Sequence, residues 1–370
     1  MPKQLNSQHD DVTKYEEYDD YGDYRQRGFK KPKPKRKSKE LIPGIVVRGR
    51  GHHYDVQTWF NTGGDTGANT GRDHDPNAEN GFRLCRVRGR LLQEKQTSTL
   101  VAVGDRVKVL PNGTTKGQIE EIEERETALS RRQPFANPPM EDVILANPDQ
   151  VLIVFAIQQP DPHLRMLDRF LVIAEYSELP AIICVNKVDL VEMDYAKQTF
   201  GLYEEIGYDV CYTSTETGEG LDKLRTLMHG QTSVLSGPSG VGKSSLLNAL
   251  YPQLNLDTGE LRDFLGKGRH TTRAAHLLQI PTKSDDPDAL TFVADTPGIR
   301  ELGLFDIETA DLGFCYKEIE PFVNDCHFPN CTHDHEPGCA VRQAVEDGHV
   351  THVRYDSYLR LMRGEHLNTN

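Results

Sequence analysis

The middle of the chain alternates short apolar runs with longer segments whose apolar residues recur at helical spacing. The runs predict buried strands at residues 149–156, 180–185, 208–212, 232–236 and 290–294. Residues 163–178 place their apolar side chains on one helical face, and residues 244–250 predict the first turns of another helix. Continuous apolar strands between helices are typical of a parallel sheet covered on both faces. We therefore expect an α/β domain at residues 134–313.

The first part of the chain, residues 41–132, has a β pattern with turns rich in Gly, Asn and Asp. Strands are predicted at residues 44–47, 82–92, 100–110 and 117–130. Residues 61–81 predict a long flexible loop. About five short strands in roughly ninety residues suit a small barrel such as the OB-fold, an oligonucleotide-binding fold. We assign this barrel to residues 41–133.

Basic residues gather at two places in this region. Arg86, Arg88 and Arg90 alternate with apolar or small residues, so we expect them to share one strand face. Residues 1–40 form an arm that is acidic from 10 to 23, has nine basic residues from 25 to 39, and is predicted to be disordered. Each feature has an alternative to nucleic-acid binding: the three arginines could form a solvated, salt-bridged strand face, and the arm could be a solubilising tail. Taken together they favour contact between the three arginines and RNA phosphates.

The overall composition is that of a globular protein. Hydrophobic residues make up 36% of 370 residues, enough for two or three domains. The formal net charge of −13 is not typical of a nucleic-acid-binding protein, but the average hides the segregation of charge described above. The longest apolar run, residues 151–157, is far shorter than the roughly 20 residues that cross a bilayer. We expect a monomeric cytoplasmic protein without a signal peptide or membrane contact.

A complete phosphate-binding loop lies between the fourth predicted strand and the helix that follows it. Residues 237–244 match G-x-x-x-x-G-K-[ST], in which glycines let backbone N–H groups surround phosphate oxygens. Lys243 is expected to reach the outer phosphates and Ser244 to bind Mg²⁺. The start of the helix adds a dipole that favours phosphate. The alternative, a glycine-rich turn without a ligand, is weak for so specific a match.

A guanine-reading motif precedes this loop. Asn186, Lys187 and Asp189 form N-K-x-D after the second predicted strand. The Asp carboxylate can accept hydrogen bonds from the N1–H and the exocyclic amine of guanine, whereas adenine offers no such donor pair. Residues 214–218 follow the next strand, where a GTPase offers backbone N–H groups to the guanine carbonyl. We therefore expect GTP rather than ATP.

Two more motifs complete the set that a GTPase requires. Residues 295–298 match D-x-x-G, whose Asp holds the Mg²⁺ shell and whose Gly meets the γ-phosphate. Residues 268–273 predict a switch loop in which Thr271 or Thr272 ligates Mg²⁺, and analogy with other T-T-R loops favours Thr272. Ile299 replaces the glutamine that orients the attacking water in many GTPases. His270 is the candidate for that role; a surface histidine is the alternative.

The order of these motifs is rotated, because the base-reading motifs come before the phosphate loop. Loops that follow parallel strands meet at one edge of the sheet, so joining the old chain ends and cutting elsewhere preserves the site. We therefore predict a circularly permuted P-loop GTPase domain. The segment after Gly298 then leads directly into the last domain, which should respond to the bound nucleotide.

The predicted nucleotide site comprises the following residues. Catalytic roles are assigned to Lys243, His270 and Thr272, and Mg²⁺ ligation to Ser244 and Thr272. Contacts with GTP or GDP are assigned to Asn186, Lys187, Asp189, Ser214, Thr215, Gly237, Pro238, Ser239, Gly240, Val241, Gly242, Lys243, Ser244, Ser245, Asp295 and Gly298.

The last domain, residues 314–370, contains three of the seven cysteines in a loop-rich stretch. Cys326, Cys331 and Cys339 with one histidine would give a tetrahedral, closed and therefore structural zinc site. His333, His327 and His335 are the possible nitrogen ligands, and free cysteines are the alternative to a metal. The remaining cysteines, at 85, 184, 211 and 315, are predicted to be buried free thiols. A helix is expected near the carboxyl end of the chain.

The motif order N-K-x-D, S-x-x-x-G, G-P-S-G-V-G-K-S, G-R-H-T-T and D-T-P-G-I-R-E-L, followed by C-x4-C-x-H-x2-E-P-G-C-A-V, resembles the circularly permuted ribosome-associated GTPase family RsgA (YjeQ). The resemblance spans residues 41 to about 361. It implies an OB-fold, a permuted GTPase domain and a zinc domain that act in late maturation of the small (30S) ribosomal subunit, with its rRNA as the activating partner. It also implies that Cys326, Cys331, His333 and Cys339 are the zinc ligands.

Two other functions remain open at this point. The protein could be a nucleotide-controlled RNA-binding switch or chaperone that needs no catalysis, or a P-loop kinase. The sequence shows no signature of a kinase substrate pocket, and Asp189 indicates a guanine nucleotide, which argues against a kinase.

Overall fold

The computed structural model describes residues 40–58, 81–91, 98–132, 141–254, 275–280, 290–295 and 307–365. The predictions for the amino-terminal arm, apart from its last residue, and for the loop at 61–80 lie outside these residues, as do those for the switch loop at 268–273 and for residues 296–299. They stay predictions.

Five strands of the described chain close into a barrel. They are β1 Ile42–Arg50, β2 His53–Thr58, β3 Phe82–Val87, β4 Arg106–Asn112 and β5 Lys116–Ile122. The strand order is β1-β2-β3-β5-β4, and β4 pairs back with β1, so the sheet closes on itself. Buried valines such as Val46, Val56 and Val109 pack inside with Ile119. The predicted OB-type barrel is confirmed.

Three of the predicted barrel strands, at 82–92, 100–110 and 117–130, extend beyond the strands observed. The run at 117–130 divides into β5 and β6 Ala128–Arg132, because four consecutive charged residues interrupt it. One of them, Arg125, turns inward and forms a bidentate ion pair of 2.7 and 2.9 Å with the fully buried Asp105. Asp105 also caps a turn by accepting from the Ala102 N–H at 2.7 Å, so residues 101–105 are not a strand. β2, which is mostly polar, was not predicted.

A short antiparallel ribbon connects the barrel to the next domain. β6 pairs with β7 Glu141–Ala146 in a separate two-stranded sheet. The predicted boundary at 133/134 therefore falls between two paired strands.

The second domain is built on parallel strands. β8 Gln150–Ala156, β9 Ala181–Asn186, β10 Asp209–Thr213, β11 Thr232–Ser236 and β13 Thr291–Asp295 follow the predicted apolar runs closely. Their order is β10-β9-β8-β11-β13, and the antiparallel β12 His276–Ile280 continues the sheet to β1 of the barrel. All five predicted strands are confirmed.

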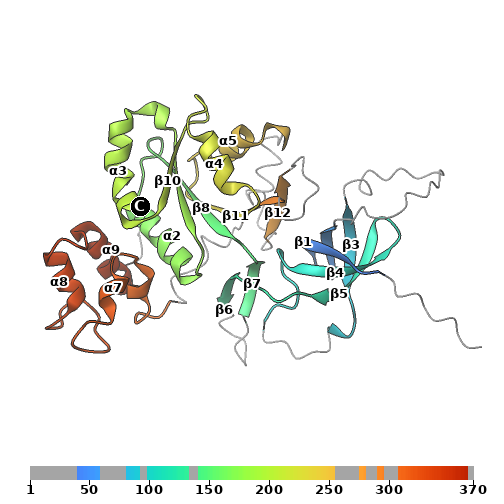
Figure 1. The fold of residues 1–370 in the computed structure, drawn as a ribbon, viewed down its shortest axis with the longest axis horizontal. Coiled ribbons are helices and arrows are strands. Elements are labelled where there is room, and N and C mark those ends of the chain that lie inside the picture. The colour runs from blue at the N-terminus through green and yellow to red at the C-terminus, as the bar shows by residue number, and fades with distance from the viewer. Residues whose placement is uncertain are drawn as a thin grey trace, which may run out of the picture. The chain divides into compact units, whose positions relative to one another are not determined.

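Helices cover both faces of this sheet. They are α2 Leu164–Tyr176, α3 Met193–Ile206, α4 Leu221–Met228 and α5 Lys243–Leu250, with short 3-10 turns η2 Val188–Leu190 and η3 Pro252–Leu254. Alternate residues of β8 face opposite layers: Ile153 and Phe155 pack with α2 and α3, and Leu152 and Val154 with α4 and α5. In Figure 1, α2 and α3 lie on one side of the strands and α4 and α5 on the other. Two buried faces explain why the strands lack polar alternation.

The last part of the chain folds into short helices: η7 Leu312–Cys315, α7 Glu320–Val323, α8 Ala340–Glu346 and α9 His352–Met362. The expected carboxyl-terminal helix is therefore confirmed as α9. Tyr316, Ile319, Val341 and Tyr358 form its core together with Val172 of α2. No helix in the described part of the chain combines the length and apolar character needed to cross a membrane. The four cysteines outside the metal-like cluster are buried and free, as predicted.

Candidate nucleotide site and metal centre

The phosphate loop runs from the end of β11 to the start of α5. Gly237, Gly240 and Gly242 have φ values of 126°, 84° and 94°, which disfavour any other residue. A Cβ at Gly237 would lie 2.1 Å from the Val154 carbonyl oxygen, and one at Gly242 would lie 2.6 Å from Asn186 Nδ2. The sequence motif therefore has a steric cause at both positions.

Lys243 begins α5 and folds back over the loop. Its Nζ donates hydrogen bonds to the carbonyl oxygens of Gly237 at 2.8 Å and Pro238 at 2.7 Å. This brings its ammonium group over the loop, where it can meet phosphate oxygens. Ser244 and Ser245 follow in the first turn of the helix, whose N–H groups favour anions.

The base-reading motif contacts this loop directly, although more than fifty residues separate them. Asn186, which is fully buried, donates from Nδ2 to the Val241 carbonyl oxygen at 2.9 Å. Lys187 donates from Nζ to the Gly240 carbonyl oxygen at 2.9 Å and also to that of Gln159. The two motifs whose order is reversed in the sequence thus form one site, as the permutation requires.

Ser214 holds the guanine-reading carboxylate. Its hydroxyl donates to Asp189 Oδ1 and accepts the N–H groups of Glu216 and Thr217, each at 3.2 Å. Thr215 lies half-buried in the same turn, while Asp189 is exposed at its rim. The Asp189 carboxylate is therefore held in place at the exposed rim of this turn.

Sequence reasoning missed two groups that support this site. Thr213, the last residue of β10, donates from its hydroxyl to Asn186 Oδ1 at 3.3 Å and so orients the amide. The second group is the carbonyl oxygen of Gln159, which accepts a hydrogen bond from Lys187 Nζ. A hydroxyl directly before Ser214 was a weak signal for the first group, and no local pattern indicated the second.

The D-x-x-G motif begins at the edge of the phosphate loop. Asp295 is the last residue of β13 and pairs with Leu235 of β11, two residues before Gly237. The other predicted members, Gly298, His270 and Thr272, lie outside the described residues.

The three arginines assigned to RNA do not share one strand face. β3 ends at Val87, where its pairing with β5 stops, so Arg88 and Arg90 lie beyond it. Arg88 forms an ion pair with Glu120, and Arg86 donates to His53 Nε2 at 2.7 Å. The geometric expectation was wrong, because the strand is shorter than its alternating pattern. The assignment to RNA stays a prediction.

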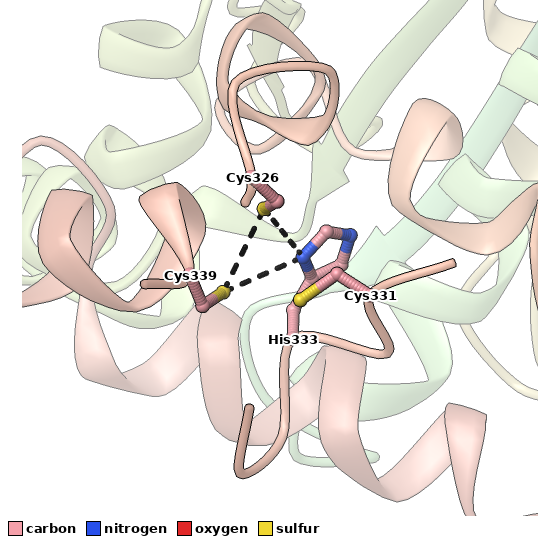
Figure 2. A group of neighbouring side chains, drawn as sticks. All are labelled: Cys326, Cys331, His333 and Cys339. Atoms are coloured by element: carbon pink, nitrogen blue, oxygen red, sulfur yellow. Dashed lines mark hydrogen bonds between the residues drawn. The ribbon is translucent and has the colours of Figure 1, made fainter. Parts of the chain in front are cut away.

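The cysteine and histidine cluster comes together in the last domain (Figure 2). The ligand atoms of Cys326, Cys331, His333 and Cys339 all lie within 4.8 Å of one another. Cys326 Sγ is 3.9 Å from Cys339 Sγ, and these sulfurs are 3.4 and 3.5 Å from His333 Nδ1. Tetrahedral Zn²⁺ would separate two sulfurs by about 3.8 Å and a sulfur from a nitrogen by about 3.5 Å. The four residues therefore fit zinc.

Hydrogen bonds to the backbone around His333 hold this residue in the cluster. His333 has a left-handed φ of 60°, unusual for a residue other than glycine, and its carbonyl accepts from the Tyr355 hydroxyl at 2.6 Å. Tyr358 donates to the Thr332 carbonyl at 3.0 Å. Burial lowers the pKa of His333, against a smaller raising effect of Glu336, which favours the neutral ring that ligates metal.

Sequence reasoning included Glu336 in the family motif but assigned it no role. Its carboxylate accepts from the Thr332 N–H at 2.9 Å, the Thr332 hydroxyl at 2.6 Å, and the N–H groups of Asp334 and His335 at 3.2 Å. Four bonds to one side chain fix the turn around His333. The signal in the sequence was its place in the H-x2-E-P-G-C part of that motif, which does not reveal these partners.

Comparisons with known proteins agree with this geometry. A family model described as RsgA GTPase matches residues 122–305. A "Small ribosomal subunit biogenesis GTPase RsgA" from Gemmatimonas aurantiaca is 44% identical and the match covers 86% of this chain and 95% of the relative. A protein of the same description from Chlorobaculum tepidum is 38% identical, with 88% and 98% covered.

Two solved structures share the fold. YjeQ from Thermotoga maritima is 32% identical, with a TM-score of 0.65, and the match covers 88% of this chain and 98% of that one. YloQ, described as a circularly permuted GTPase, is 31% identical, with a TM-score of 0.62 and 88% and 95% covered. The predicted fold, a barrel followed by a permuted GTPase domain and a small domain with a possible zinc site, is therefore confirmed.

Proposed function

Because the chain belongs to the RsgA GTPase family and is therefore a GTP hydrolase, we propose that it binds the small (30S) ribosomal subunit, acts in its late maturation, and is stimulated by it. The observation that supports this most is a match over 95% of a relative described as a small ribosomal subunit biogenesis GTPase. The contact between the base-reading motif and the phosphate loop supports the hydrolase itself.

Each part of the site has a proposed role in hydrolysis. Asp189 reads guanine, and the backbone of residues 237–242 with Lys243 holds the phosphates. Ser244 and Thr272 would ligate Mg²⁺, which neutralises charge on the transferred phosphoryl group when bound. Asp295 would hold the water shell of that ion, and the Gly298 N–H would meet the γ-phosphate.

The need for a partner follows from one substitution in the motif. Ile299 stands where many GTPases have a glutamine, and its side chain cannot hydrogen-bond the attacking water. Intrinsic hydrolysis should therefore be slow. His270 in the switch loop is proposed to orient the water once rRNA is bound.

The remaining regions are proposed to hold the ribosomal subunit. The barrel and the basic half of the amino-terminal arm would contact rRNA, and a structural zinc ion at Cys326, Cys331, His333 and Cys339 would stabilise the last domain. The zinc supplies no catalytic step, because four protein ligands leave no open position. Ribosome maturation implies a cytoplasmic protein, and we propose that it acts as a monomer.

Turnover of GTP with and without purified small subunits tests this function. We expect stimulation of about tens-fold, because the partner completes the site. His270→Ala should lose the stimulation and keep GTP affinity, while His352→Ala, an exposed histidine on α9, should behave as wild type. Equal turnover with and without subunits would reject the proposal in favour of a switch without catalytic need. ATP binding as strong as GTP binding would favour a kinase.

A further inference from the structure

A pocket of about 520 Å³ lies where the barrel meets the GTPase sheet. Barrel strands β1 and β3 and the turn before β5 form one side, and β12 forms the other. The two sides are joined by the antiparallel pairing of Arg48 with His276. The strands that line the pocket thus belong to one continuous sheet in the described residues.

The pocket is strongly basic, although the chain as a whole has a net charge of −13. Arg48, Arg50, Arg83 and Lys116 line it, against a single lining carboxylate, Asp55. Asp55 Oδ2 accepts a hydrogen bond from Arg50 Nε at 2.7 Å and so offsets the positive charge of that arginine. The lining as a whole stays positively charged. The pocket therefore favours an anion.

One of these cations is built into the wall. Arg83 is only 4% exposed, and its Nη1 donates to the carbonyl oxygens of Gly113 at 2.6 Å and Lys116 at 3.3 Å. Arg48 and Lys116, in contrast, are exposed and can move toward a ligand. Burial lowers the pKa of His276 and Arg48 lowers it further, while Asp55 partly opposes them, which is consistent with a positive local potential.

The far wall of the pocket leads to the nucleotide site. β12 begins three residues after the end of the predicted switch loop, and His276 is the cross-strand partner of Asp295 on β13. Asp295 opens the D-x-x-G motif. A ligand that fixes β12 against the barrel therefore acts one strand away from this motif and next to the end of the switch loop.

We propose that this pocket binds a backbone phosphate of RNA and thereby couples RNA contact to the switch. The inference rests on the proposed function, and it names a contact site other than Arg86, Arg88 and Arg90. Two of those arginines already have protein partners, Glu120 and His53. Phosphate recognition by several cations without base contacts predicts binding that is insensitive to sequence and sensitive to salt.

The test uses the full-length protein and a fluorescent uridine oligomer of about twelve nucleotides, with anisotropy measured over a range of NaCl concentrations. Arg48→Gln and Lys116→Gln should each weaken binding about fivefold and reduce the slope of log K against log salt by about 0.7. Lys197→Gln, an exposed lysine on α3, is the matched control and should leave both unchanged. Intrinsic GTP turnover should be the same in all variants.

The outcomes separate this inference from the proposed function. The wild type could bind RNA and be stimulated by small subunits while both pocket variants have the same RNA affinity and salt slope as Lys197→Gln. That result would reject the role of the pocket and leave the proposed function intact. Competition by inorganic phosphate as strong as by RNA, at equal ionic strength, would also overturn it in favour of a small-anion site. A wild type that neither binds the oligomer nor responds to subunits would reject both. Weaker subunit stimulation in the pocket variants, alongside weaker RNA binding, supports the coupling.

Discussion

At the scale of single residues, Glu336 shows how one carboxylate outside the candidate zinc ligands can shape the loop that carries them. It binds backbone groups on both sides of His333 and so stabilises the left-handed conformation that turns this ring toward the cysteines. Ligand identity alone does not produce this geometry. Partners outside the ligand set orient metal ligands in many proteins.

We predict that Glu336→Gln weakens zinc retention, because an amide offers one acceptor oxygen and presents a donor to the other N–H groups. The loss should be about 1–3 kcal/mol in folding stability, with faster release of zinc to a chelator. Zinc release and thermal unfolding are the measurements. Glu346→Gln, an exposed change on α8, is the control. If both variants release zinc at the wild-type rate, Glu336 has no positioning role.

At the scale of elements, the phosphate loop depends on packing against a neighbouring loop as well as on its own glycines. Gly242 caps α5 in the left-handed region, and Asn186 occupies the space where a side chain would be. The amide of Asn186 in turn holds the Val241 carbonyl. The loop and the base-reading motif therefore stabilise each other, and both should be ordered before a nucleotide binds.

Gly242→Ala should lower GDP and GTP affinity at least tenfold. The new Cβ meets the amide at 2.6 Å and the backbone is held at φ 94°, so the loop must shift. Titration with a fluorescent GDP analogue measures this effect. Gly207→Ala is the control, since Gly207 has φ 100° but open space around it. That change should lower stability by about 1 kcal/mol and leave nucleotide affinity intact. Equal affinity in both variants would contradict the mutual support.

At the scale of the whole molecule, the last domain is fixed to the GTPase domain by a buried ionic cluster. Arg354 of α9 is fully buried, forms ion pairs with Asp168 of α2 and with Glu318, and stacks 4.6 Å from the Tyr316 ring. Tyr203 of α3 donates to Asp168 at 2.8 Å. The last domain is thus held at α2 and α3 as well as through the chain after Gly298. Any movement that the segment after Gly298 imposes on it must strain or break this cluster.

Arg354→Met should destabilise the protein by about 3–5 kcal/mol, because it leaves two carboxylates without their cation in a buried site. Urea unfolding measures the loss. The control is Arg360→Met in the same helix, whose ion pairs with Asp356 and Glu365 are exposed and should contribute little to stability. A loss of similar size in both variants would show that the cluster does not hold the domain.

The sequence by itself determined the chemistry that depends on residues near one another in the chain. The phosphate loop, N-K-x-D and the cysteine spacing are local patterns, and the apolar runs of β8, β9 and β11 predicted strands to within one or two residues. Local patterns suffice there because a turn around phosphate, or a strand buried on both faces, restricts nearly every residue in it.

Only the tertiary structure decided which groups meet across the chain. The contact of Asn186 with Val241, the bonds of Glu336, the end of β3 before Arg88 and the cluster around Arg354 depend on packing between distant segments. Alternating residues can predict a strand but not where its partner stops pairing, and a polar residue does not reveal its partner. Pairing between distant segments is set by how whole layers pack, so it becomes visible only when those layers are assembled.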